Sequence, residues 1–310
     1  MKTWDVIIIG SGPAGCTAAL YAGRADLKTL VVAGFEAGGQ LMITSDVENY
    51  PGFAEAITGP DLMAAMRAQA ARFGAEFRDE DATAVDFTGP PFKVTSSSGT
   101  HVSRSVIVAT GSAAKWLNLP SETKLRGKGV SACATCDGFF FKEKEVVVVG
   151  GGDSAMEEST FMTKFATKVY LVHRRDAFRA SKIMQERVLE HPKIEVIWNT
   201  EIAELLGEER VEGVRLKNVV DNSERTLPVQ GYFAAIGHNP NTDLFRGQLS
   251  LDEAGYILAA GPHDTSTNVP GVFVAGDVFD HRYKQAVTAA GSGCKAAMDA
   301  EKWLESEGKT

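Results

Sequence analysis

Two cysteines three residues apart stand in the segment SACATCDGFF, at Cys133 and Cys136, and Asp137 follows them directly. The chain has 310 residues and four cysteines, so half of its thiols lie in this one segment. Thiols at this spacing serve three purposes in proteins, namely metal binding, a structural disulfide or reversible oxidation. The surrounding sequence must decide between them.

A zinc site needs four ligands, and the sequence offers neither a second C-x-x-C nor a nearby pair of histidines, so no metal site is expected. A disulfide across three residues closes too small a loop to stabilise the fold by much. The pattern therefore favours a redox pair in which backbone dipoles stabilise one thiolate. Asp137 is a candidate general acid or base for the exchanging thiol, or else a turn residue before Gly138. The other two cysteines, Cys16 and Cys294, are expected to pack in the core.

The composition narrows the setting of this chemistry. With 44% hydrophobic and 23% charged residues the chain is typical of a globular protein, and its length suits two domains. A net charge of −8 argues against a nucleic-acid partner. The apolar run VIII at 6–9 is too short to span a membrane and lacks a signal-peptide layout, which predicts a cytoplasmic protein. In such a reducing compartment a C-x-x-C is rarely a passive crosslink.

Two segments share one order of elements: a buried strand, a glycine turn and a helix. They are WDVIIIGSGPAG (4–15) and EVVVVGGGDSAMEE (145–158). The second lies between two strand endings that suit the first, near 105–112 and 271–278. The sequence thus predicts an α/β protein of two Rossmann-like dinucleotide-binding domains, one inserted into the other. The expected limits are 1–114 and 244–310 for the outer domain and 115–243 for the inserted domain, which carries the cysteine pair.

The first glycine turn has the G-x-G-x-x-G spacing of a pyrophosphate site. Gly10 permits the tight turn, Gly12 lets the backbone approach a phosphate, and Gly15 lets the helix pack on the strand. Glu36 follows about twenty residues later, where a ribose ligand is expected. Gly276 and Asp277 end a late strand and would place a carboxylate on a polyhydroxyl chain such as ribitol, so flavin is the natural candidate here.

The second glycine turn is followed by a different set of charges. It has the G-x-G-x-x-A spacing, and its next strand ends in His173, Arg174 and Arg175, with Arg179 close behind. Guanidinium groups suit the 2′-phosphate of NADP(H), whereas an acid there would repel it. The alternative is a solvated basic face at the end of an element. The pattern predicts that the inserted domain binds NADP(H).

The motifs together resemble the bacterial low-molecular-weight thioredoxin reductases from end to end. The matching segments are GSGPAG, GGQL (38–41), ENYPG (48–52), ATGS, SACATCDGFF, GGGDSAMEE, HRRDAFRAS, AIGHNPNT and GVFVAGDVFDHRYKQA. The resemblance implies a homodimer with FAD in the outer domain and NADPH in the inserted one. Electrons would pass from NADPH to FAD, then to the Cys133–Cys136 disulfide and on to thioredoxin. It also implies that Cys136 faces the flavin and that Cys133 attacks the substrate.

The resemblance extends to individual cofactor contacts. For FAD they are Gly10, Ser11, Gly12, Pro13, Ala14, Gly15, Ala33, Glu36, Gly38, Gly39, Gln40, Asn49, Thr110, Gly111, Gly276, Asp277, Lys284, Gln285 and Ala286. For NADPH they are Gly152, Asp153, Ser154, Arg174, Arg175 and Arg179.

Three other functions compete with this interpretation. A flavoprotein that feeds a peroxidase usually carries an extra N-terminal thioredoxin-like region, whereas the first nucleotide strand here begins at residue 4. Ferredoxin–NADP reductases of similar build lack the cysteine pair. A redox-silent NADPH sensor would have no use for the intact CATCD segment.

Overall fold

The structure is a computed structural model that describes residues 3–44, 46–261 and 264–308. The chain divides into two compact units, which we call the outer and the inserted domain. The outer domain runs to Ala113 and resumes at Asn239, and the inserted domain is Ala114–His238. The sequence expectation placed the two joins near 114 and 243. Among the described residues no helix has the length and apolar character that a membrane crossing requires.

The outer domain is built on a seven-stranded sheet around β1 (Thr3–Ile9). The apolar run of β1 suits the middle of a parallel sheet, where both faces are covered. It pairs in parallel with β2 (Thr29–Val32) and β8 (Gly99–Val108). The start of β8 is antiparallel to β7 (Phe92–Ser96), and its end is parallel to β19 (Val272–Val274). The outermost strands are β5 (Glu76–Arg78) and β6 (Ala84–Asp86).

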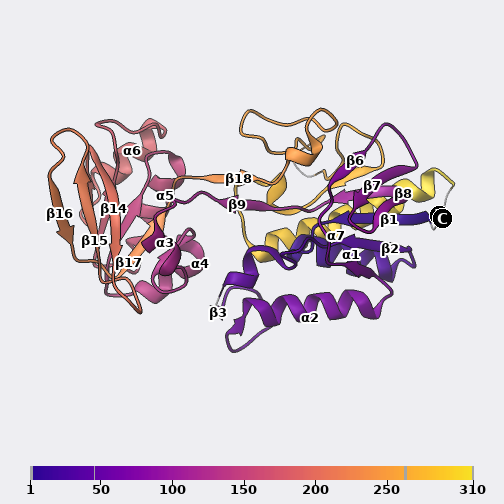
Figure 1. Ribbon diagram of the computed structural model, residues 1–310, viewed down its shortest axis with the longest axis horizontal. Helices are drawn as coiled ribbons and strands as arrows, with labels where there is room; N and C mark the ends of the chain where they lie inside the picture. The colour runs from indigo at the N-terminus through magenta and orange to yellow at the C-terminus, as the bar shows by residue number, and fades with distance from the viewer. Residues whose placement is uncertain (1–2, 45, 262–263, 309–310) are drawn as a thin grey trace. The chain divides into compact units, whose positions relative to one another are not determined.

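Two helices of the outer domain, α1 (Pro13–Arg24) and α7 (Ala286–Ser306), pack side by side (Figure 1). They approach so closely that a Cβ on Gly293 would lie 2.1 Å from the carbonyl oxygen of Ala14. Alternate residues of β1 belong to separate apolar clusters, so each face of the sheet has its own core. The smaller elements of this domain are α2 (Gly59–Arg72), β3 (Asp46–Val47), β4 (Ile57–Thr58), and the 3₁₀ turns η1 (Gly39–Ile43), η3 (Asp243–Phe245) and η4 (Gly276–Val278).

The inserted domain has a five-stranded parallel sheet in the order β10-β17-β11-β12-β13. Its central strands β11 (Glu145–Val149) and β12 (Lys168–Val172) are rich in valine, which favours a buried parallel strand. The first of them leads through a glycine turn into α5 (Asp153–Met162). The other elements are β10 (Val130–Ser131), β13 (Ile194–Ile197), β17 (Gly231–Ala234), α3 (Pro120–Lys124), α4 (Ala134–Asp137), η2 (Gly138–Phe141), α6 (Lys182–Leu189), and the antiparallel strands β14 (Thr200–Leu206), β15 (Gly213–Asn218) and β16 (Glu224–Leu227).

The chain passes between the domains along two short strands, β9 (Ser112–Ala114) and β18 (His238–Pro240), which pair with each other. At the outer-domain end of this ribbon, Asn241 N–H donates to the Gly111 carbonyl at 3.0 Å. At the other end, Lys115 N–H donates to the Gly237 carbonyl at 2.9 Å. Two dinucleotide-binding sheets, one inserted within the other, confirm the predicted fold class.

Candidate active site

The first glycine turn joins β1 to α1, and its geometry excludes other residues. Gly10 has φ +106°, and a Cβ there would lie 2.3 Å from the Ala109 carbonyl oxygen. A Cβ on Gly15 would lie 2.0 Å from the Gly10 carbonyl oxygen. Gly12 stands at the N-cap of α1 with open space at its Cβ position, and no described side chain caps the helix there. The helix N-terminus is therefore free to receive a pyrophosphate, as the sequence predicts.

The predicted loop 33–40 is tied to this turn through one hydroxyl group. Ser11 Oγ donates to the Ala33 carbonyl at 2.8 Å and accepts from Gly38 N–H at 2.9 Å. Gly38 and the next glycine both have positive φ values, which a larger side chain would strain. The Glu36 side chain is exposed, where it can meet a ribose hydroxyl.

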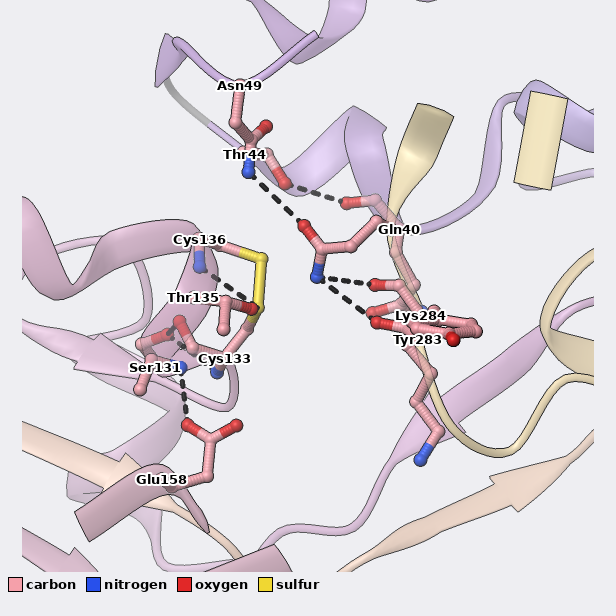
Figure 2. The surroundings of a disulfide bond; sticks show 12 residues. Gln40, Thr44, Asn49, Ser131, Cys133, Thr135, Cys136, Glu158, Tyr283 and Lys284 are labelled. Atoms are coloured by element: carbon pink, nitrogen blue, oxygen red, sulfur yellow. Dashed lines mark hydrogen bonds between the residues drawn. A yellow bond between two sulfur atoms is a disulfide. The ribbon is translucent and has the colours of Figure 1, made fainter. Parts of the chain in front are cut away.

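The other predicted flavin residues lie at the ends of β8 and around the start of α7. Asn49, labelled in Figure 2, donates through Nδ2 to Gln285 Oε1 at 3.3 Å. Gln285 is the N-cap of α7, so this bond joins the ENYPG loop to the helix. Thr110 Oγ1 donates to the carbonyl of Asn241 at 2.7 Å. Sequence reasoning did not single out Asn241, which also donates through Nδ2 to the Thr110 carbonyl at 2.8 Å.

Asp277 lies in η4, between the last strand of the sheet and α7. Burial, with a contribution from the charge of Asp280, raises the pKa of Asp277 to about 6, although Lys284 acts in the opposite direction. A half-buried carboxylate that is costly to ionise gains from hydroxyl donors. The polyhydroxyl chain predicted here would supply such donors.

We expect Asp277→Asn to stabilise the flavin-free protein by on the order of 2 kcal/mol at pH 8. The folded state binds the Asp277 proton more tightly than the unfolded state does, so the wild type loses stability as the pH rises from about 4 to about 6, and the loss is complete above pH 6. Asparagine avoids that penalty. The advantage should shrink to about half at pH 5 and vanish near pH 4. Urea unfolding of both proteins at the three pH values measures it, and an equal advantage throughout would contradict the titration of Asp277.

The second glycine turn joins β11 to α5 in the inserted domain. Gly150 has φ +158°, and a Cβ there would lie 2.3 Å from the Ala235 carbonyl oxygen. Gly152 is the N-cap of α5 with open space at its Cβ position, and no cap from a side chain is present in the described chain. The turn thus provides the same free helix start as the first one.

The segment from Arg174 to Arg179, which we call the arginine loop, is hydrogen-bonded to this turn. Arg179 N–H donates to the Gly151 carbonyl at 2.8 Å. Asp153 Oδ1 accepts from both the N–H and the hydroxyl of Ser181, each at 2.9 Å. The three predicted arginines are exposed, and among the described residues none of them has a carboxylate partner in an ion pair; they are Arg174, Arg175 and Arg179. Unneutralised guanidinium groups beside a free helix start suit a phosphate dianion.

His173 departs from the basic cluster in which the sequence placed it. Its ring is buried and lies against the glycine turn, so a Cβ on Gly151 would come within 2.2 Å of the ring. Nε2 lies 3.1 Å from the Ala177 carbonyl, and the ring contacts Phe178 and Trp198. Burial lowers the pKa of His173, which favours the neutral ring. The His173 ring therefore packs against the backbone of Gly151 and supports the glycine turn.

The cysteine pair forms a disulfide, with the Cα atoms of Cys133 and Cys136 5.3 Å apart (Figure 2). Cys133 is the N-cap of α4, and its sulfur accepts from Cys136 N–H at 3.2 Å. Thr135 Oγ1 lies 3.3 Å from the same sulfur. When the disulfide opens, these donors favour the thiolate on Cys133 over that on Cys136.

Asp137 ends α4 directly after Cys136. Burial raises the pKa of its carboxyl, and a hydrogen bond from Ser131 opposes that shift. A carboxyl group that keeps its proton more readily than usual is suited to donate one to a leaving thiolate. In the adjoining η2, Phe139 is 60% and Phe140 40% exposed, whereas Phe141 is buried.

One residue near the pair escaped the sequence analysis. Glu158 of α5 accepts a hydrogen bond from the N–H of Ala134, the residue that follows Cys133 (Figure 2). Glu158 is the last residue of the matching segment GGGDSAMEE, but the segment alone gives it no role, because its contact with Ala134 depends on the packing of α5 against α4.

The remaining cysteines have separate environments. Cys16 is buried in α1, and burial raises the pKa of its thiol to about 12. Cys294 is only half-buried, so the expectation that it packs in the core is wrong. The described residues contain no cluster of three or more histidine, cysteine or acidic residues that could hold a metal ion.

The geometry agrees with comparisons to known proteins. The family model of pyridine nucleotide-disulphide oxidoreductases matches residues 4–293. Thioredoxin reductase of Mycolicibacterium smegmatis is 57% identical over 97% of this chain and 96% of its own length. The solved thioredoxin reductase from Giardia duodenalis is 48% identical, with a TM-score of 0.94 over 98% of this chain and all of that one. The chain belongs to the low-molecular-weight thioredoxin reductases.

A further relative bears on the substrate. A protein of Mycobacterium leprae named bifunctional thioredoxin reductase/thioredoxin is 54% identical over 97% of this chain and 66% of its own length. Membership of the family implies FAD and a nicotinamide nucleotide. The two open glycine turns, each at an uncapped helix start, fit the pyrophosphates of these cofactors.

Proposed function

We propose that the protein uses NADPH to reduce the disulfide of thioredoxin. The observation that carries the proposal is the disulfide of Cys133 and Cys136, placed at the start of α4 with donors aimed at one sulfur. The same domain holds the glycine turn and the arginine loop, whose guanidinium groups have no carboxylate partner among the described residues, and the two together suit NADPH. The named activity of the relatives supports the assignment.

The residues that would hold the cofactors follow from the two turns. In the outer domain, Gly12 would face the pyrophosphate of FAD, Glu36 its ribose and Asp277 its ribitol. In the inserted domain, Gly152 would face the pyrophosphate of NADPH, and the arginine loop its 2′-phosphate. FAD, when bound, supplies the two-electron chemistry that connects a nicotinamide to a disulfide.

The reduced cysteine pair then carries out two exchange steps. The Cys133 thiolate attacks one sulfur of the substrate disulfide, which forms a mixed disulfide and expels the other substrate sulfur as a thiolate. The Cys136 thiolate next attacks the Cys133 sulfur, which closes the internal disulfide and expels the second substrate thiolate. Two electrons pass from the pair to the substrate, and Asp137 donates a proton to a leaving thiolate.

We assign the partner contact to the exposed aromatic side chains of η2. Phe139 and Phe140 follow the cysteine pair within four residues and expose apolar surface that a protein partner can cover. The fusion in the Mycobacterium leprae relative supports thioredoxin as that partner, because its name assigns both activities to one chain.

We also propose that the protein is a homodimer and acts in the cytoplasm. Tyr21 of α1 and Met298 of α7 are 41% and 44% exposed on helices that pack together, and such apolar side chains suit a subunit interface. Light scattering should give about twice the chain mass of 33.2 kDa.

The function is tested with the purified protein and NADPH. We expect a yellow protein that reduces disulfide-bonded thioredoxin, followed by loss of NADPH absorbance and by free thiols on thioredoxin. Oxidised glutathione serves as the control disulfide and should react slowly, because it lacks a protein surface to cover Phe139 and Phe140. A yellow protein that oxidises NADPH but leaves thioredoxin oxidised would contradict the proposal.

A further inference from the structure

Asp81 lies between β5 and β6 and is hydrogen-bonded to the loop 33–40. Its Oδ1 accepts from the N–H of Phe35 at 3.0 Å. Phe35 directly precedes Glu36, the residue expected at the ribose of FAD. Asp81 follows Phe35 by 46 residues and lies outside all the motifs of the sequence analysis. The contact therefore links the expected ribose ligand to a residue that no motif marks.

The two amides before Phe35 are bound by the same segment of chain. Ala33 N–H donates to the Arg78 carbonyl at 2.8 Å, and Gly34 N–H donates to the Glu80 carbonyl at 3.0 Å. The chain then turns at Gly34, which has φ +85°. Phe35 is the third amide in this row, and its acceptor is a side chain instead of a carbonyl. The first two bonds survive any substitution of the acceptor residue, whereas the third depends on the identity of residue 81.

The segment that carries this aspartate is itself anchored on two sides. Both carboxylate oxygens of Asp79 accept from Arg67 of α2, at 2.7 and 3.1 Å. Glu80 Oε2 accepts from the Ser96 hydroxyl at 2.6 Å and from Ser98 N–H at 3.0 Å. These bonds, the one from Ser96 above all, lower the pKa of Glu80 to about 2. The acceptor for the Phe35 amide thus stands on a support that is tied to α2 and to the hairpin of β7 and β8.

The other end of the loop is fixed as well. Gly38 N–H donates to the Ser11 hydroxyl, as described above. Glu36 stands between the two fixed points, and within the described part of the chain its exposed carboxylate has no ion-pair partner. The position of that carboxylate therefore depends on the bonds at Phe35 and at Gly38.

We propose that Asp81 is a positioning residue for the FAD site. Its bond to the Phe35 amide holds the loop in one conformation, so that Glu36 is placed before the cofactor arrives. A loop that is already ordered loses less conformational entropy on binding, which favours the bound state. The effect on FAD rests on the proposed function, whereas the effect on the loop does not.

The hydrogen bond and the charge of Asp81 act on FAD in opposite directions. FAD carries a pyrophosphate, so a further carboxylate near its site disfavours binding. The hydrogen bond favours binding, because it orders the loop. A variant that keeps the bond and removes the charge therefore separates the two effects.

The test compares Asp81→Ala with Asp81→Asn in the purified protein. Hydrogen exchange of the peptic peptide that covers residues 33–40 reports the Phe35 amide, and flavin fluorescence after dilution reports the release of FAD. For Asp81→Ala we expect exchange of one amide in that peptide to rise about tenfold and FAD release to rise about fivefold, the range that loss of one hydrogen bond gives. Asp81→Asn keeps an oxygen acceptor, so both of its rates should stay within about twofold of the parent.

The matched control is Asp79→Ala, which removes a neighbouring exposed carboxylate from the same segment and leaves the bond to Phe35 in place. Both of its rates should equal those of the parent. Unchanged exchange in Asp81→Ala overturns the proposal, and so does FAD release that rises equally in Asp81→Asn or Asp79→Ala. A parent protein without FAD contradicts the proposed function and the FAD part of this proposal, but the exchange result still decides whether Asp81 holds the loop.

Discussion

Replacing Cys136 by serine is expected to lower NADPH-driven reduction of thioredoxin by at least about a thousandfold, as loss of a catalytic nucleophile does in other enzymes. Cys133 can still attack the substrate, but no second sulfur remains to displace it. With a thioredoxin variant whose second redox cysteine is serine, which cannot reverse this step, the substrate should therefore accumulate as a stable mixed disulfide with Cys133. Mass spectrometry under non-reducing conditions should detect this adduct at one thioredoxin per chain.

The matched control for this variant is Cys294→Ser. Cys294 is half-buried in α7 of the outer domain and takes no part in the exchange, so the variant should retain normal turnover. Substantial turnover by Cys136→Ser would mean that another thiol completes the reaction, and it would refute the roles given to the pair.

The second large effect concerns the choice of nucleotide. We expect Arg174→Ala/Arg175→Ala to raise the Michaelis constant for NADPH about a hundredfold, because two charge-assisted hydrogen bonds to the 2′-phosphate are worth on the order of 3 kcal/mol. NADH lacks that phosphate, so its Michaelis constant should change little. Steady-state rates with both nucleotides measure the difference.

Arg225→Ala provides the control for the loss of positive charge in the inserted domain. Arg225 is exposed on β16, away from the glycine turn in sequence, and its removal should leave both Michaelis constants nearly unchanged. Equal losses for NADPH and NADH in the double variant would show that the arginines do not recognise the 2′-phosphate.

The parts of the site that the sequence could predict are those fixed by local backbone geometry. Gly10 and Gly150 leave no room for a Cβ against the end of a neighbouring strand, so the glycine itself reports the turn. The spacing of Cys133 and Cys136 likewise reports a disulfide, since it lies within a single turn of chain. In both cases the residues that make the structure are close together in sequence.

The parts that could not be predicted depend on contacts between distant segments. Glu158 reaches Ala134 only because α5 packs on α4. His173 precedes two arginines in sequence, yet its ring packs against Gly151. The face of the sheet to which a side chain at a strand end points is fixed only when the whole sheet has formed. Cys294 has small neighbours typical of a core, but the face of α7 on which it lies is only partly covered.

The paired connections β9 and β18 bear on how such a chain can evolve. Gly111 and Asn241 are hydrogen-bonded within the outer domain, and Lys115 and Gly237 within the inserted one. In each domain, the two points at which the chain leaves and re-enters are therefore adjacent. A module with adjacent ends can enter or leave a host at the entropic cost of one short loop. The inserted domain is one continuous segment whose ends are adjacent, so a single recombination event can transfer it whole. Such an event would carry the nucleotide site, the redox pair and Glu158 together into another flavoprotein.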